Sequence, residues 1–264
     1  MASSDAPMTV ARLALRVRDL DRVGDFYQRV IGLDRIAGDG EALMLGQGDL
    51  PLIELRRDRA AQSEPRGAGL FHTAFLLPSR GDLGRWLEHA RTLALPLDGA
   101  SDHLVSEAVY LHDPEGNGIE VYADRPRETW NSNGHEVQMA SAPMDVAGVL
   151  AAGGGAGWNG APSGTVIGHV HLQLGDIPAA EAFYADRLGF DVTARLPQAS
   201  FFATGGYHHH LAGNTWRSCG ARMRDEGAAG LDELFLAVDA QRMAGLGFCD
   251  VRDPWGNRIT VLPG

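Results

Sequence analysis

The sequence predicts an α+β fold of four βαβββ-type modules, arranged as two paired-module domains with a shortened last module. Two motifs recur along the chain, apolar residues alternate before the first motif, and short apolar runs broken by Gly, Asp and Pro follow it. Alternation is typical of a half-buried strand, and such short runs are typical of a meander. We therefore expect a first module pair at residues 8–123, a linker at 124–165 and a second pair at 166–264.

The first motif joins a strand to a helix in the first and third modules. Alternating apolar residues, such as Leu13, Leu15 and Val17, predict the strand. Asp19 then stands at a helix N-cap position, a Phe-Tyr pair follows, and Gly32 ends the helix. Residues 170–189 repeat this order, with Asp176 and Gly189 at the two ends. Strands at 42–45 and 52–55 continue the first module.

The second motif closes the second and fourth modules. Residues 113–120 read Asp-Pro-Glu-Gly-Asn-Gly-Ile-Glu, and residues 253–260 read Asp-Pro-Trp-Gly-Asn-Arg-Ile-Thr. In the second module we expect strands at 70–77, 108–111 and 118–122 and a helix at 81–93. The fourth module, 231–264, has room for a first strand, a short turn at 243–247 and closing strands, so its helix is missing or vestigial.

Charge and composition exclude several classes of protein. Lys and Arg total 23 against 34 Asp and Glu, so the net charge of −11 argues against nucleic acid as a partner. No apolar run is long enough to span a bilayer, and the N-terminus lacks the regions of a signal peptide, so we expect a cytoplasmic protein without a membrane partner. The two cysteines, Cys219 and Cys249, fit neither a disulfide scaffold nor a zinc site.

The paired modules and both motifs resemble the vicinal oxygen chelate superfamily, which contains glyoxalase I, bleomycin-resistance proteins and extradiol dioxygenases. Within it, the chain is most similar to the bacillus-type catechol 2,3-dioxygenases. Residues 115–120, Tyr-Ala-Asp-Arg-Pro at 122–126 and Gly-Gly-Tyr-His-His-His at 205–210 carry this similarity.

The resemblance implies metal ligands on the first and last strands of the modules. The first-strand positions hold Arg12, His72, His169 and Glu233, and the last-strand positions of the second and fourth modules hold Glu120 and Thr260. Arginine stays protonated and cannot coordinate a metal. His72, Glu120 and His169 together make two histidines and one carboxylate, the set that suits non-haem Fe(II). This set requires the second module to share a cleft with the third, and the outer two modules to form a cleft without metal.

The resemblance also implies the remaining active-site groups. His209 matches the acid/base histidine, Tyr110 the tyrosine that binds the substrate, and His103 a further histidine of the proton chain. On the strand expected there, His209 would face opposite to His208 and His210.

An extradiol ring-cleaving dioxygenase, acting on a catechol-type aromatic with Fe(II) and dioxygen, is the function that this resemblance implies. Two alternatives stay open on the same fold: a non-catalytic protein that binds an aromatic metabolite, and a glyoxalase-type isomerase or lyase. The sequence leaves open Mn(II) in place of Fe(II), the particular aromatic substrate and the formation of a homo-oligomer.

Overall fold

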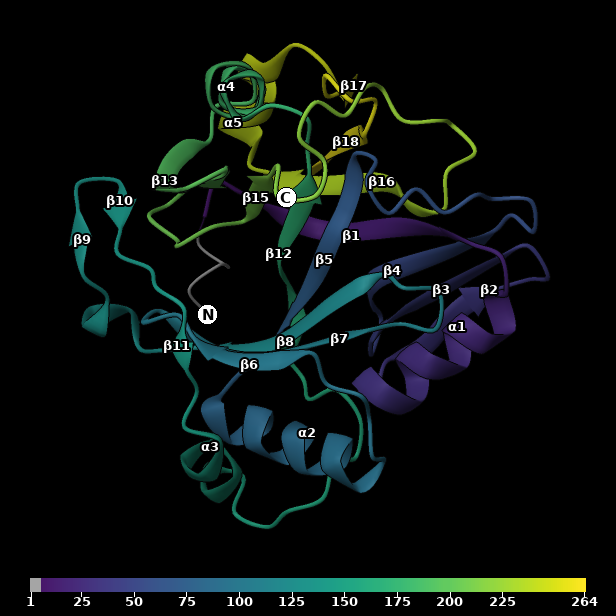
Figure 1. Ribbon diagram of the computed structural model, residues 1–264, viewed down its shortest axis with the longest axis vertical. Helices are drawn as coiled ribbons and strands as arrows, with labels where there is room; N and C mark the ends of the chain where they lie inside the picture. Colours follow the sequence, from purple (N-terminus) through teal and green to yellow (C-terminus); the bar gives the residue numbers. More distant parts are fainter. Residues whose placement is uncertain (1–5) are drawn as a thin grey trace.

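The computed structural model describes residues 6–264 and confirms an α+β fold (Figure 1). Its strands form sheets of nine and seven strands and one short two-stranded sheet. The two large sheets are made from the four modules predicted from the sequence.

Each of the first three modules has a strand, a helix and three further strands. The first module comprises β1 (Met8–Val17), α1 (Leu20–Phe26) continued by the π-helical η1 (Tyr27–Ile31), β2 (Asp34–Gly38), β3 (Ala42–Gln47) and β4 (Leu50–Arg57). The second comprises β5 (Gly69–Leu76), α2 (Arg80–Thr92), β6 (Gly99–Asp102), β7 (Ser106–His112) and β8 (Gly118–Asp124). The third comprises β12 (Val166–Gln173), α4 (Ile177–Glu181) continued by η3 (Ala182–Arg187), β13 (Asp191–Leu196), β14 (Ala199–Ala203) and β15 (Leu211–Asn214).

The fourth module is shortened, as predicted. It comprises β16 (Gly230–Val238), α5 (Ala240–Leu246), β17 (Asp250–Arg252) and β18 (Arg258–Pro263). The segment expected to contain only a turn therefore holds a short helix, which Asp239 caps by accepting a hydrogen bond from the Arg242 amide. One closing strand is missing relative to the other modules.

Strand pairing joins the modules in the order that the candidate ligands require. The nine-stranded sheet runs β11-β6-β7-β8-β5-β12-β15-β14-β13, so the second and third modules share it. The seven-stranded sheet runs β17-β18-β16-β1-β4-β3-β2, so the first and fourth modules share the other. The expected exchange of partners is confirmed, and both sheets cross the linker between the predicted halves 8–123 and 166–264.

The recurring motifs contact each other and hold consecutive modules together. The Tyr184 hydroxyl donates to the Asp253 carboxylate at 2.7 Å. The Tyr27 hydroxyl lies 3.5 Å from the Asp113 carboxylate. Each carboxylate also accepts hydrogen bonds from the Asn four residues later and so fixes the tight turn before the closing strand. The Tyr of one module is thus paired with the turn of the next.

Glycines end the helices of the first and third modules, as predicted. Gly32 and Gly189 have φ values of 83° and 80°, in the left-handed region that glycine adopts without strain. Asp19 and Asp176 cap the other ends by accepting from the Arg22 and Ala179 amides. The local sequence therefore determines both helix boundaries.

The connection between residues 124 and 165 is more ordered than its Gly-rich composition indicates. It contains η2 (Arg127–Thr129), β9 (Ser132–Asn133), β10 (Glu136–Val137), β11 (Ala142–Pro143) and α3 (Val146–Ala152). Helix α3 packs on α2 at Gly84, where a Cβ would lie 2.2 Å from the Val149 carbonyl oxygen. The expectation of an irregular linker misses this packing because it depends on contacts with a distant helix.

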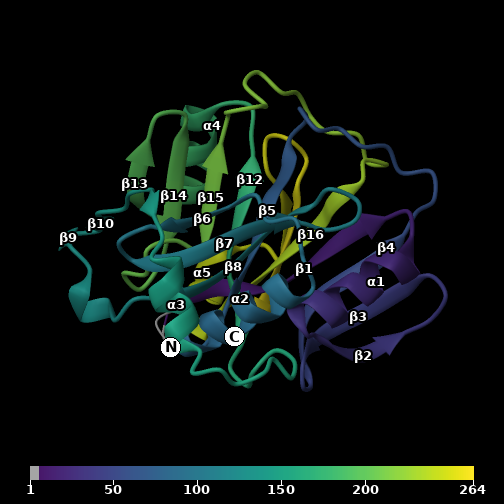
Figure 2. The same ribbon diagram turned by 60° about the horizontal axis from the view of Figure 1, so that its bottom comes forward.

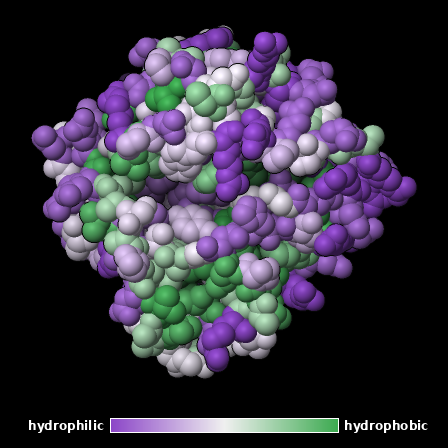
Figure 3. Space-filling view, in the orientation of Figure 1, coloured by the Kyte–Doolittle hydropathy of each residue, from purple (hydrophilic) through white to green (hydrophobic). Residues whose placement is uncertain are grey.

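Figure 2 shows that α2 and α3 lie together on one side of the nine-stranded sheet. In the space-filling view of Figure 3, apolar residues gather over the part of the face where Figure 1 places these two helices, and hydrophilic residues cover much of the remainder. Among the described residues, no helix is long and apolar enough to cross a membrane.

Candidate metal centre

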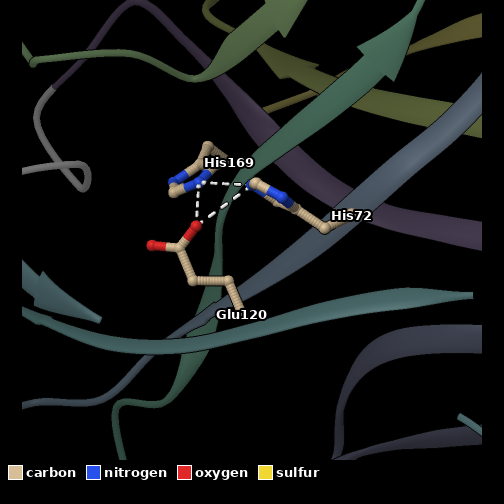
Figure 4. A group of neighbouring side chains, drawn as sticks. All are labelled: His72, Glu120 and His169. Atoms are coloured by element: carbon tan, nitrogen blue, oxygen red, sulfur yellow. Dashed lines mark hydrogen bonds and ion pairs between the residues drawn. The ribbon is translucent and has the colours of Figure 1, made fainter. Parts of the chain in front are cut away.

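Three side chains from the central strands of the nine-stranded sheet converge on one point (Figure 4). His72 lies on β5, Glu120 on β8 and His169 on β12, and all three are buried. Strands β5 and β12 are antiparallel with Thr73 opposite Val170, and β8 lies parallel to β5 with Glu120 opposite Ala74. The register of these strands brings together residues far apart in the sequence.

The distances within this group match those between ligands of one metal ion. The Nε2 atoms of His72 and His169 are 3.4 Å apart, and each lies 3.0–3.1 Å from Oε2 of Glu120. Ligands at about 2.1 Å from a metal and at right angles to one another are about 3 Å apart. The three residues therefore fit one face of a coordination octahedron. Within residues 6–264, no other His, Cys, Asp and Glu side chains form such a group.

The charges of the group also favour a bound cation. Burial opposes ionisation of Glu120, but its contacts with His169 and His72 hold the pKa of its carboxyl well below the usual value. Burial lowers the pKa of His169 to about 4, so its imidazole is neutral at pH 7. A buried carboxylate beside a neutral imidazole leaves negative charge uncompensated, and a buried charge is costly without a counter-ion.

The symmetry of the sheet offers three candidate ligands rather than four. A two-fold axis between Thr73 and Val170 exchanges His72 with His169, and it exchanges Ala74 with His171. Glu120 lies opposite Ala74 on β8, and Ala212 lies opposite His171 on β15. Ala212 is thus the counterpart of Glu120 and offers no side-chain donor atom, so the candidate set has no fourth member at this position.

The group lies in the wall of a cavity of about 510 Å³. Aromatic and apolar side chains supply much of its lining, among them Phe71, Val105, Met139, Leu196, Phe201 and Trp216. Trp216, Leu196 and Arg217 are exposed and therefore lie toward its mouth. An engineered cavity of about 150 Å³ holds one benzene, so this one is large enough for a substituted aromatic ring.

Tyr110 and His103 form a hydrogen-bonded pair that lines the same cavity. The Tyr110 hydroxyl and His103 Nε2 are 2.6 Å apart, and His103 Nδ1 lies 2.6 Å from the Ala140 carbonyl oxygen. A carbonyl only accepts, so Nδ1 carries the proton and Nε2 accepts from Tyr110. Burial, with the charge of Glu120, raises the pKa of Tyr110 well above its usual value, so the phenol stays protonated.

His209 lines the cavity next to the metal ligands. Its ring centroid is 4.0 Å from that of His169. Burial, with the charge of His169, lowers its pKa well below the usual value, so the imidazole is neutral. The strand expected at this triplet is wrong: residues 204–210 form a loop between β14 and β15, in which Gly205 and Gly206 have φ of 62° and 68°. The turn brings His208 and His209 into contact, instead of pointing them to opposite faces.

Sequence reasoning gave no role to several groups near the site. His171 is buried against His72 and Phe71, and its Nε2 accepts from the Asn214 amide at 3.0 Å. Trp216 is 46% exposed and lines the cavity. His169 and His171 share a strand face, which was the available signal for His171. For Trp216 the sequence offered none.

Comparisons with known proteins agree with this architecture. Residues 9–121 and 166–218 match the model of the glyoxalase/bleomycin resistance protein/dioxygenase superfamily. A catechol-2,3-dioxygenase from Bacillus subtilis (strain 168) is 40% identical over 238 residues, which are 86% of this chain and 81% of that protein.

Solved structures share the fold at low sequence identity. A candidate dioxygenase from Bacillus subtilis subsp. subtilis str. 168 superposes with a TM-score of 0.64 at 13% identity, covering 98% of this chain and 86% of that one. Glyoxalase I from Zea mays superposes with a TM-score of 0.56 at 14% identity, covering 97% of this chain and 92% of that one. These likenesses concern the fold alone.

Proposed function

Because the chain belongs to the glyoxalase/bleomycin resistance protein/dioxygenase superfamily, we propose that it is an extradiol dioxygenase, which opens a catechol-type ring with Fe(II) and dioxygen. The buried group of His72, Glu120 and His169 is the observation that carries this proposal. Two imidazoles and one carboxylate form the facial set that non-haem Fe(II) oxygenases use, with open positions for substrate and dioxygen. When bound, Fe(II) would supply the redox chemistry with dioxygen.

The position of Ala212 favours a dioxygenase over a glyoxalase-type isomerase. Such isomerases use four protein ligands with two carboxylates, whereas Glu120 is the one carboxylate of the group here. Ala212 takes the place of the second carboxylate. The three-ligand set thus suits a reaction in which two reactants need room at one metal.

The other cavity residues have roles that follow from their protonation. The Tyr110 hydroxyl stays protonated and donates its one proton to His103, so its oxygen can accept a hydrogen bond from a catechol hydroxyl. His209 is neutral, and its imidazole can accept a proton from a catechol hydroxyl and return it later. The apolar walls exclude water from the ring. The cavity also has room for a substituent on the catechol.

Metal analysis and a ring-opening assay test the proposal. Protein purified without oxygen is loaded with Fe(II) or with Mn(II), its metal content is measured, and catechol and substituted catechols are added with dioxygen. We expect one metal ion per chain and formation of the coloured ring-cleavage product. Metal binding with tight catechol binding but no product under either metal would favour the non-catalytic binding protein. Isomerisation of a hemithioacetal would favour the glyoxalase-type enzyme.

A further inference from the structure

A chain of hydrogen bonds leads from the cavity to the end of strand β8. His209 Nδ1 lies 2.7 Å from His208 Nδ1, and His208 Nε2 lies 3.0 Å from Oδ1 of Asp124. His208 is fully buried, whereas the Asp124 side chain is 14% exposed. A carboxylate at the protein surface is thereby connected to the histidine beside the candidate metal ligands.

The acceptor at one end determines every proton position along this chain. An ionised carboxylate only accepts, so His208 must carry its proton on Nε2. With this one ring proton, His208 has a bare Nδ1 that accepts from His209, so His209 carries its proton on Nδ1. His209 Nε2 is left without a proton, and it has no hydrogen-bond partner among residues 6–264.

We propose that Asp124 and His208 are positioning residues that fix His209 as the tautomer with a bare Nε2 toward the cavity. A bare nitrogen is what a general base needs, since the other tautomer would present an N–H to the substrate hydroxyl. The role of this arrangement in catalysis rests on the proposed dioxygenase function. The tautomer of His209 does not depend on that function.

Aromatic side chains surround this chain of hydrogen bonds. Tyr207 donates to both oxygens of Asp124 at 3.1 and 3.2 Å, and its hydroxyl lies 2.8 Å from that of Tyr122. The Trp130 ring packs on His208 with centroids 5.2 Å apart. Asp124 therefore receives hydrogen bonds from two directions, and one of them can be removed without touching the bond to His208.

The alternative is that Asp124 and His208 only stabilise the loop at residues 204–210. In that case the tautomer of His209 would be independent of Asp124. An Asp124→Asn variant separates the two roles because an amide can present either its oxygen or its NH₂ group to His208 Nε2. Tyr207→Phe is the matched control, since it removes a hydrogen bond to the same carboxylate and leaves the His208 bond intact.

Nuclear magnetic resonance of ¹⁵N-histidine-labelled, metal-free protein at neutral pH reads the tautomers directly. Signals are assigned by their loss in His208→Gln and His209→Phe variants. In the unmodified protein and in Tyr207→Phe we expect His209 protonated on Nδ1 and His208 on Nε2. In Asp124→Asn we expect the opposite tautomers to appear. His209 protonated on Nε2 in the unmodified protein would overturn the proposal.

Turnover of the iron-loaded protein gives a second readout. Asp124→Asn should lower kcat by about 10- to 100-fold, the usual cost of losing a group that orients an active-site histidine, with KM and iron content preserved. Tyr207→Phe should leave kcat near that of the unmodified protein. Equal kcat in the two variants would overturn the positioning role. A complete lack of ring cleavage by the unmodified protein would instead contradict the dioxygenase function, and the tautomer measurement would still decide this inference.

Discussion

The nine-stranded and seven-stranded sheets contain modules of the same two types, but their central strands carry different chemistry. In the nine-stranded sheet, His72, Glu120 and His169 point at one another with no cationic side chain between them. In the seven-stranded sheet, Glu233 stands near the corresponding point and accepts from Thr260 and from Arg56. Arg12, the counterpart of His169 in the sequence repeat, places its guanidinium 3.9 Å from the Phe235 ring centroid.

In the seven-stranded sheet, Arg56 supplies a positive charge to three carboxylates. Its guanidinium donates to Glu54 at 2.8 and 2.9 Å, to Asp232 at 2.7 Å and to Glu233 at 2.9 Å. Arg56, with Arg16 as a second cation on Asp232, thus supplies positive charge beside these carboxylates. The same fold can therefore pair a buried carboxylate with its own arginine or leave it beside histidines, where a bound cation would balance its charge.

The corresponding loops of the two sheets differ in length. Strands β3 and β4 are joined by a tight turn at Gly48 and Asp49, whereas β14 and β15 are joined by residues 204–210. The longer loop carries the histidine triplet.

Replacing His209 by Phe should reduce turnover by about 10²- to 10⁴-fold, the usual contribution of a general acid/base. Steady-state kinetics of the iron-loaded variant measure this, and loss of bound iron would instead make His209 a ligand.

Removing the carboxylate charge should affect the two sheets differently. Glu120→Gln keeps the shape but offers a neutral, weaker donor, so Fe(II) affinity should fall by about tenfold or more. Anaerobic titration of metal-free protein with Fe(II) measures the affinity. Glu233→Gln is the matched control and should leave it unchanged. Equal Fe(II) affinities for the unmodified protein and Glu120→Gln would contradict the assigned centre.

Removing the cation of the seven-stranded sheet should cost stability without affecting the metal. Arg56→Met leaves three carboxylates without their shared partner. Because Arg56 is 30% exposed, solvent limits the loss in free energy of unfolding to about 1–3 kcal/mol. Urea unfolding measures this loss, while iron content should stay at one per chain. A drop in iron content would show that the two sheets are not independent.

Acid should destabilise the nine-stranded sheet first, because the strands of the seven-stranded sheet contain no histidine. Burial lowers the pKa of His210 to about 3 from 6.5, so the unfolded chain binds its proton before the folded chain does. Stability is therefore complete above pH 6.5 and is lost as the pH falls toward 3, by at most about 1.4 kcal/mol per pH unit for this group.

Asp232 of the other sheet titrates later. Burial opposes its ionisation, but the hydrogen bonds and charges of Arg56 and Arg16 hold the pKa of its carboxyl below 3.8, so its contribution is lost only at lower pH. Urea unfolding of metal-free protein between pH 7 and 4.5 checks this order. His210→Phe should flatten the dependence, and an unchanged slope would contradict the assignment to this histidine.

Local patterns predicted the helix boundaries. They followed from Asp19, Gly32 and their repeats, because capping and left-handed φ depend on single residues. The candidate ligands and Tyr110 came from the resemblance to a known family, and they stay predictions; chemistry alone excluded Arg12. The register of β7 and β8 makes Tyr110 and Glu120 a direct cross-strand pair.

The contacts between distant segments depend on tertiary structure. The network around Arg56, the packing of α3 on α2 and the contact of Asp124 with His208 join segments far apart in the chain, so no local pattern predicts them. The loop at residues 204–210 shows why: a strand would separate His208 from His209, and two left-handed glycines bring them together. The sequence states the chemistry of each side chain. The distances between side chains and the positions of their protons depend on which distant strands become neighbours.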